Sequence, residues 1–135
     1  MDTLQVGTRQ RVEFIDITRQ VNQWLTSQST ASGVLTLFVP HTTAGIMIYE
    51  NADPDMIRDL TVQLDKLVPF EDNYRHAEGN AAAHIKATFI GSSVHVPVEG
   101  GQLQLGTWQG IFFAEFDGPR RRRSVQMQLL GAASG

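Results

Sequence analysis

Four histidines are the residues of this sequence whose chemistry is most useful in a site. His41 follows an apolar run, His76 lies in a polar stretch, and His84 falls near the start of an alanine-rich segment. Two or three neutral imidazoles with a carboxylate and one open position are typical of a catalytic zinc site. No H-E-x-x-H motif is present, so two interpretations stay open: a converging set, or ordinary surface and capping histidines. His95 alternates with apolar neighbours, which predicts a solvent-facing structural residue.

Acidic residues gather between Glu50 and Glu78, where there are eight of them against three basic residues. Asp53 and Asp55 stand at a predicted helix start, where a carboxylate complements the helix dipole. Glu50 and Asn51 precede that start. They are candidates for an oxygen ligand, a proton acceptor or a substrate clamp, with a purely structural role as the alternative.

A glycine-flanked aromatic follows in Gly106-Thr107-Trp108-Gln109-Gly110. Backbone amides beside glycine, with the Thr107 hydroxyl, suit an anion, and Trp108 suits stacking on a heterocycle. The alternative is a tight turn with Trp108 in the core.

Arg120 to Arg123 hold four of the eleven basic residues. If they lie in a strand, their side chains alternate between its two faces, so at least two point outward, toward phosphate or toward acids of another subunit. The run has no interleaved aromatic residues and the net charge is −3, which argues against nucleic acid as a partner.

These residues need an α+β scaffold to position them. Ile17, Val21, Trp24 and Leu25 share one helical stripe. Asp53-Pro54 is a strong helix start, and Asn80 to Ile90 predicts a helix with Asn80 as its cap and Gly91 after its end. Residues 68–80 predict a long loop. The following ranges predict strands or extended chain: 3–15, 34–39, 45–49, 94–98, 103–105, 111–116 and 125–129, with a hairpin turn at 99–101.

Composition narrows the class of protein further. The chain has 135 residues and no cysteine, which excludes disulfide scaffolds, thiol catalysis and thiolate metal sites. Its length fits one domain, residues 1–135, mainly an antiparallel sheet with two or three helices. No apolar run is long enough for a membrane span and no signal peptide is evident, so we expect a soluble cytoplasmic protein.

In combination, several motifs resemble the YjbQ family, also called secondary thiamine-phosphate synthase-like proteins. They are His41-Thr42-Thr43-Ala44-Gly45, Glu50 to Asp55, Tyr74-Arg75-His76, Ala83 to Lys86, and Gly106 to Gly110 with Glu115 to Arg120. The resemblance covers nearly the whole chain. It implies an α+β homotrimer whose activity joins an aminopyrimidine methyl diphosphate to a thiazole phosphate, with loss of pyrophosphate.

The resemblance also implies roles for individual residues. A divalent metal, zinc or magnesium, or a substrate phosphate would bind His41, His76 and His84 at a subunit boundary. Catalytic roles fall to His41, Glu50, Asn51, Asp53 and His84. Contacts to a small phosphorylated substrate fall to Thr42, Thr107, Trp108, Gln109 and Arg120. Two alternatives remain: a metal-dependent hydrolase of a small ester or phosphate, and a non-catalytic trimeric ligand-binding protein.

Overall fold

The computed structural model of the chain describes residues 1–132, which form three helices and eight strands. The helices are α1 (Thr18–Thr26), α2 (Pro54–Leu67) and α3 (Ala81–Ile90). The strands are β1 (Asp2–Val6), β2 (Glu13–Asp16), β3 (Gly33–Phe38), β4 (Ala44–Glu50), β5 (Ser93–Glu99), β6 (Gln102–Leu103), β7 (Gln109–Glu115) and β8 (Arg123–Gly131). No helix within residues 1–132 is long and apolar enough to cross a membrane.

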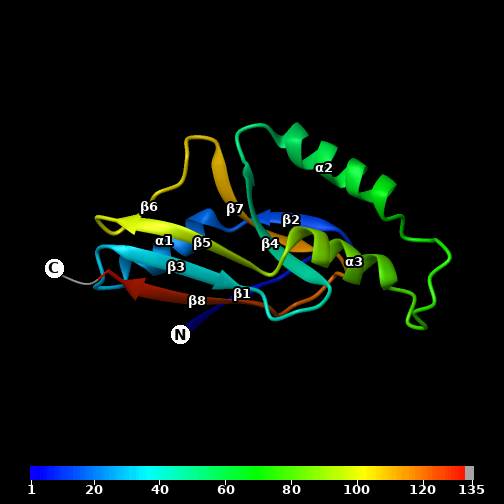
Figure 1. The fold of residues 1–135 in the computed structure, drawn as a ribbon, viewed down its shortest axis with the longest axis horizontal. Coiled ribbons are helices and arrows are strands. Elements are labelled where there is room, and N and C mark those ends of the chain that lie inside the picture. Colours follow the sequence, from blue (N-terminus) through cyan, green and yellow to red (C-terminus); the bar gives the residue numbers. More distant parts are fainter. Residues whose placement is uncertain (133–135) are drawn as a thin grey trace.

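The strands form two antiparallel sheets (Figure 1). The larger sheet has the order β1-β8-β3-β5-β6, and the smaller has the order β2-β7-β4. Strand β8 lies between β1 and β3, so the two ends of the described chain pair with each other. The α+β architecture with mainly antiparallel strands is therefore confirmed.

The main core fills the space between the sheets. Leu35 and Met127 of the larger sheet pack in one cluster with Ile46 and Phe113 of the smaller sheet. Helix α1 adds its apolar stripe to the same core, with Val21 fully buried. The stripe expected from the helical period is thus the face that α1 buries.

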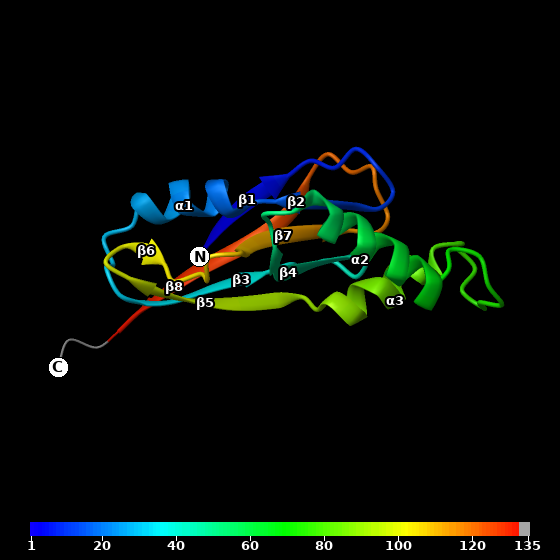
Figure 2. The same ribbon diagram turned by 90° about the horizontal axis from the view of Figure 1, so that it is seen from above.

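Helices α2 and α3 pack against the smaller sheet through a second cluster, in which Leu64 and Ala83 contact Phe116. Both lie at the end of the molecule opposite α1, with the 68–80 loop beyond them (Figures 1 and 2). The approach of β4 to α3 depends on Gly45, because a Cβ there would lie 2.5 Å from the Gly91 carbonyl oxygen.

Three local expectations need correction. The strand expected at 103–105 ends at Leu103. The last strand, expected at 125–129, begins earlier, because β8 starts at Arg123 opposite Val6, where its partner β1 ends; of the Arg120–Arg123 run only Arg123 therefore lies in a strand. Asn80 occupies the N-cap position of α3, but its side chain makes no capping bond. Its amide donates instead to Asp117 Oδ2 at 2.9 Å.

Candidate functional site

His41 is fixed by the first residues of β8. Its Nε2 accepts a hydrogen bond from the backbone N–H of Ser124 at 2.9 Å. A neutral imidazole has one acceptor nitrogen, so this bond leaves the proton on Nδ1, which is a donor. Burial lowers the pKa of His41, the Arg123 and Arg120 charges lower it further, and Glu115 opposes them. His41 is therefore a neutral hydrogen-bond donor.

A buried ion pair supports the loop that carries His41. Arg123 donates from Nε to Glu115 Oε1 at 2.9 Å and from a terminal nitrogen to Oε2 at 2.5 Å. The same guanidinium donates to the Thr43 hydroxyl at 2.8 Å, and the Thr8 hydroxyl donates to Glu115 Oε1 at 2.8 Å. The bidentate geometry explains how two charges are tolerated in the interior.

Glu115 is fully buried and remains ionised in this network. Burial alone raises its pKa, but hydrogen bonds from Arg123, Thr8 and the Asp117 backbone outweigh burial, so the pKa lies below its ordinary value. Its Oε2 also accepts the backbone N–H groups of Phe116 and Asp117, both at 3.1 Å. The carboxylate thus fixes the start of the turn that leads to Arg120.

Arg120 lies on that turn and lines the same cavity as His41 and Arg123. Its guanidinium donates to Asp117 Oδ2 at 3.2 Å, and the arginine side chain is half exposed. Asp117 Oδ2 also accepts the Asn80 amide. One carboxylate therefore connects Arg120 to the start of α3.

His84 and His76 come together at the start of α3. Their rings meet edge to face with centroids 5.2 Å apart. His76 Nε2 lies 3.8 Å from Glu78 Oε2. His84 stands on the first turn of α3, whereas His76 belongs to the loop before it, so the loop conformation decides this contact.

A cavity of about 360 Å³ collects most of these groups. Four predicted site residues line it: His41, Thr42, His84 and Arg120. His41 and His84 also line an adjoining depression of about 390 Å³ that runs along α3. A pocket of this kind, with convergent polar groups, is the default location for a ligand.

Six further lining residues were not predicted as site residues from the sequence, and four of them have charged or amide side chains: Glu78, Asn80, Asp117 and Arg123. Asp117 stood in the motif that carried the resemblance, directly after a predicted strand, and that position was a usable signal. Asn80 Oδ1 is buried and has no hydrogen-bond partner within the described residues. No feature of the sequence pointed to that orphaned acceptor.

The histidines do not form a ready metal site. Across residues 1–132, no three histidine or carboxylate side chains are close enough to hold one ion. The acceptor nitrogen of His41 is already used by Ser124. The three-histidine site therefore stays a prediction, and this arrangement favours an anion at His41.

His76 is in the loop before α3 and is not among the residues that line the cavity, and the remaining predicted residues lie at the far end of β4. Glu50 pairs with Gln109, whereas Ala44 at the start of the strand pairs with Glu115 near the cavity. Seven residues of strand at ~3.3 Å each put these two ends about 20 Å apart. Figure 1 shows the two loops that flank β4 at its opposite ends.

At that far end the polar atoms mostly support local structure. Glu50 Oε2 accepts the backbone N–H groups of Ala52 and Asp53, and Asp53 Oδ1 accepts that of Asp55. Asp53 is thus the N-cap that its sequence predicted.

The glycine-flanked segment packs beside this cap. The Asn51 N–H donates to the Trp108 carbonyl at 3.0 Å, and Gln109 Oε1 accepts the Gly106 N–H at 2.8 Å. Trp108 is 63% exposed and Thr107 is also exposed. The turn exists, but its tryptophan is outside the core.

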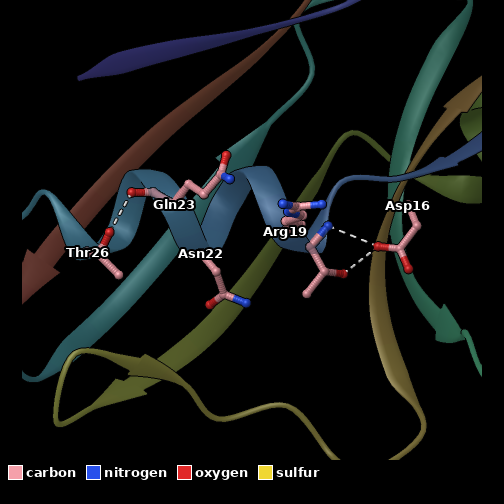
Figure 3. Close-up of a pocket in the computed structure, with 6 residues that line it drawn as sticks. Asp16, Arg19, Asn22, Gln23 and Thr26 are labelled. Carbon is pink, nitrogen blue, oxygen red and sulfur yellow. Dashed lines mark hydrogen bonds between the residues drawn. The ribbon is translucent and has the colours of Figure 1, made fainter.

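A broader depression of about 550 Å³ runs along α1 (Figure 3). None of the predicted site residues lines it. The Asp16 carboxylate accepts from the backbone and hydroxyl of Thr18, and the Thr26 hydroxyl donates to the Gln23 carbonyl. The polar groups of Asp16, Thr18 and Thr26 are thus occupied by local hydrogen bonds, and the predicted chemistry lies elsewhere.

Comparison with known proteins decides the family. A sequence profile described as "UPF0047 protein YjbQ-like" matches residues 2–132. The chain belongs to the YjbQ (UPF0047) family. YjbQ-family relatives include the UPF0047 protein YugU of Bacillus subtilis, 53% identical over 132 residues, covering 97% of this chain and 99% of YugU. MJ1081 of Methanocaldococcus jannaschii is 48% identical over 118 residues, covering 87% and 86% of the two chains.

Solved YjbQ-family structures have the same fold. A Clostridium acetobutylicum protein described as an ortholog of YugU superposes with a TM-score of 0.92 at 48% identity, covering 96% of this chain and all of that one. APE1520 of Aeropyrum pernix gives a TM-score of 0.91 at 38% identity, covering 97% and 98%. These structures support the YjbQ fold of this chain; their names state no reaction.

Proposed function

We propose that the cavity between His41, His84 and Arg120 binds the phosphate groups of a small substrate. The observation that carries this proposal is the concentration of donors around one cavity: the Arg120 guanidinium, the Nδ1–H of His41 and the Thr42 hydroxyl. Arginine and hydrogen-bond donors are the groups that bind phosphate oxygens. His84 adds a second imidazole to the lining.

The reaction proposed is the one that the resemblance implies, formation of thiamine phosphate. The thiazole nitrogen forms a bond to the methylene carbon of the aminopyrimidine methyl diphosphate. The bond from that carbon to the diphosphate oxygen breaks, and its electron pair leaves with pyrophosphate. Negative charge therefore grows on the leaving group, where Arg120 and the His41 N–H stabilise it. The fixed orientation of His41 means that this donor needs little rearrangement.

A divalent metal would assist the same departure. Magnesium takes oxygen ligands, and three side chains of the cavity offer them: Glu78, Asn80 and Asp117. The unpartnered Asn80 Oδ1 fits such a role better than it fits a closed structural network. When bound, the metal would offset the charge of the diphosphate. Zinc fits less well, because His41 Nε2 is engaged with Ser124.

A homotrimer would explain why the predicted residues divide between the two ends of β4. We propose that the Glu50–Asp53 and Trp108 end of one subunit approaches the His41 cavity of its neighbour. Exposed apolar side chains support contacts at both places: Phe89 on the helix that carries His84 is 65% exposed, and Trp108 is 63% exposed. Such large apolar groups are common at protein–protein contacts.

The experiment is a direct assay of product. Purified protein is incubated with both substrates and magnesium, and thiamine phosphate is quantified by chromatography. We expect product from the wild type and from Arg121→Gln, whose arginine is exposed outside the cavity, and a large loss in His84→Ala and Arg120→Gln. Equal product from all four proteins, or none from the wild type, would contradict the proposal. Phosphate binding without turnover would favour the non-catalytic ligand-binding alternative.

The contact between the His76 and His84 rings favours a second candidate, metal-dependent hydrolysis of a small ester or phosphate. Together with Glu78 these side chains are not close enough to hold one ion in this structure, so a metal would have to draw them together. Two imidazoles and one carboxylate are a ligand set found in zinc hydrolases. Here the rings are in contact and the carboxylate is 3.8 Å from His76. Zinc binding by the wild type that is lost in His76→Ala, with ester or phosphate hydrolysis dependent on the metal, would support this candidate. Absence of zinc binding would exclude it.

A further inference from the structure

A second cavity lies on the other side of α3. It has a volume of about 360 Å³ and includes Arg11, Asp65, Phe70, Lys86 and Phe116 in its lining. Lys86 is two residues from His84, which places the two side chains about 200° apart around the helix. The His41 cavity and this one therefore use opposite faces of α3, and they share no lining residue.

Lys86 is the unusual group in this cavity. It is 3% exposed, and lysine is almost never fully buried without a partner. Its ammonium group donates to Asp65 Oδ1, the one partner that it has within residues 1–132. An ammonium group has three N–H donors. Two donor positions on a buried cation are therefore left for a ligand or for water.

Arg11 brings a second cation to the same cavity. Its Cζ lies 3.9 Å from the centre of the Phe70 ring, a cation–π contact. Among the residues that the structure describes, the Arg11 side chain has no acidic partner and no hydrogen bond. The lining thus holds two cations and one carboxylate, an excess of positive charge.

The rest of the lining is apolar. Val12 and Phe116 lie beside two alanines of α3, Ala82 and Ala83. Phe70 completes this surface from the 68–80 loop. A free inorganic anion would leave these groups without contacts, whereas an apolar ring with one anionic group would use both parts of the cavity.

We propose that this cavity is a second binding site, which takes a small organic anion. The anionic group, a carboxylate or a phosphate, accepts hydrogen bonds from Lys86 and Arg11, and an apolar or aromatic body packs against Phe70 and Phe116. The inference is independent of the reaction proposed above, because no residue of the His41 cavity takes part.

The test is a titration followed by the backbone amide signals of Ala82, Ala83 and Lys86, which line this cavity and not the His41 cavity, in two-dimensional NMR spectra. The probes are phenyl phosphate and benzoate, with benzyl alcohol as the neutral control. We expect saturable shifts with at least one of the two anions and none with benzyl alcohol. Arg11→Gln and Lys86→Met should each weaken binding about tenfold or more, as expected for loss of a hydrogen bond to a charged group.

Arg120→Gln is the matched control, because it removes a guanidinium from the other cavity. It should leave these titrations unchanged. Arg11 is exposed, so its variant keeps the test valid if Lys86→Met does not fold. The proposal is overturned if neither anion gives saturable shifts, if Arg11→Gln binds as tightly as the wild type, or if Arg120→Gln is the variant that loses binding. None of these outcomes depends on whether thiamine phosphate is formed.

Discussion

The backbone N–H of Ser124 donates to His41 Nε2 at 2.9 Å, and this single bond decides which nitrogen of the neutral imidazole carries the proton. It turns a histidine that the sequence offered as a metal ligand into a neutral N–H donor beside Arg120. The ion pair between Glu115 and Arg123 lies behind it and holds the loop through Thr43. Of its two ring nitrogens, His41 thus leaves a hydrogen-bond donor, rather than a lone pair, for an incoming ligand.

His41 should make folding stability depend on pH. Burial and the two nearby arginines lower its pKa in the folded protein below the ordinary 6.5. As the pH falls, the unfolded chain therefore takes up the proton before the folded protein does. The contribution of His41 to the free energy of unfolding is full above pH 6.5 and is lost as the pH falls toward the folded pKa. Denaturant unfolding at about pH 7.5 and about pH 5.5 should show a larger loss in the wild type than in His41→Gln. His95→Gln, on the exposed face of β5, should behave as the wild type, and an unchanged loss in His41→Gln would refute the assignment.

Glu115→Gln should be strongly destabilising. It leaves Arg123 buried without its partner, which costs about 3–5 kcal/mol of the free energy of unfolding. The folded pKa of Glu115 is lowered, so its stabilisation is complete above the ordinary 4.5 and is lost as pH falls toward the folded pKa. Urea denaturation should show that the variant lacks this acid-dependent loss.

The exposed Glu71→Gln is the control for that measurement, with a change within about 0.5 kcal/mol. If Glu115→Gln does not fold, Glu115→Leu combined with Arg123→Met should recover stability, because it removes both charges. If Glu115→Gln alone is as stable as the wild type, the ion pair does not support the loop that carries His41.

Gly45→Ala should separate β4 from the end of α3. The new Cβ would lie 2.5 Å from the Gly91 carbonyl oxygen, which is backbone and cannot rotate away. Overpacking of this kind costs about 1–3 kcal/mol. Gly7→Ala is the control, since its Cβ would meet the nearest atom at an ordinary 3.6 Å. Thermal unfolding should rank Gly45→Ala clearly below Gly7→Ala, and equal midpoints would contradict the proposed contact.

If each site of a trimer is formed by two neighbouring subunits, two inactive variants should restore activity when they assemble together. His84→Ala damages the cavity, and Trp108→Ala damages the opposite end of β4. If the cavity of one subunit meets the Trp108 end of its neighbour, some subunit boundaries in a mixed trimer contain both an intact His84 and an intact Trp108. Unfolding and refolding the two variants together should therefore restore part of the activity, measured against each variant refolded alone. Mixed trimers that stay inactive would show that the two ends do not form one site.

Local patterns predicted most of the elements. The Asp53-Pro54 pair predicted the start of α2, and the alternation of Val125 and Met127 predicted the buried face of β8. Both signals depend on neighbours in the sequence, so no tertiary information was needed. The exact start of β8 at Arg123 was not predicted, because pairing with β1 decides where the strand begins.

The candidate site was predicted only in part, for a similar reason. Residue types and the family resemblance pointed to His41, Thr42, His84 and Arg120, which the fold brings to one cavity. The resemblance assigned Glu50 and Asp53 to the same site as His41, but β4 carries them to the other end of the sheet. The role of Arg123 could not be foreseen, because its partner Glu115 lies across a turn whose shape the sequence does not specify.

The central claim is that the cavity lined by His41, His84 and Arg120 binds the phosphate of the substrate. A crystal structure of the wild-type protein soaked with pyrophosphate and magnesium tests it most directly. We expect pyrophosphate with oxygen atoms within about 3 Å of Arg120 and of His41 Nδ1, while His41 Nε2 keeps its bond to Ser124. Pyrophosphate bound elsewhere, or an empty cavity at saturating ligand, would contradict it.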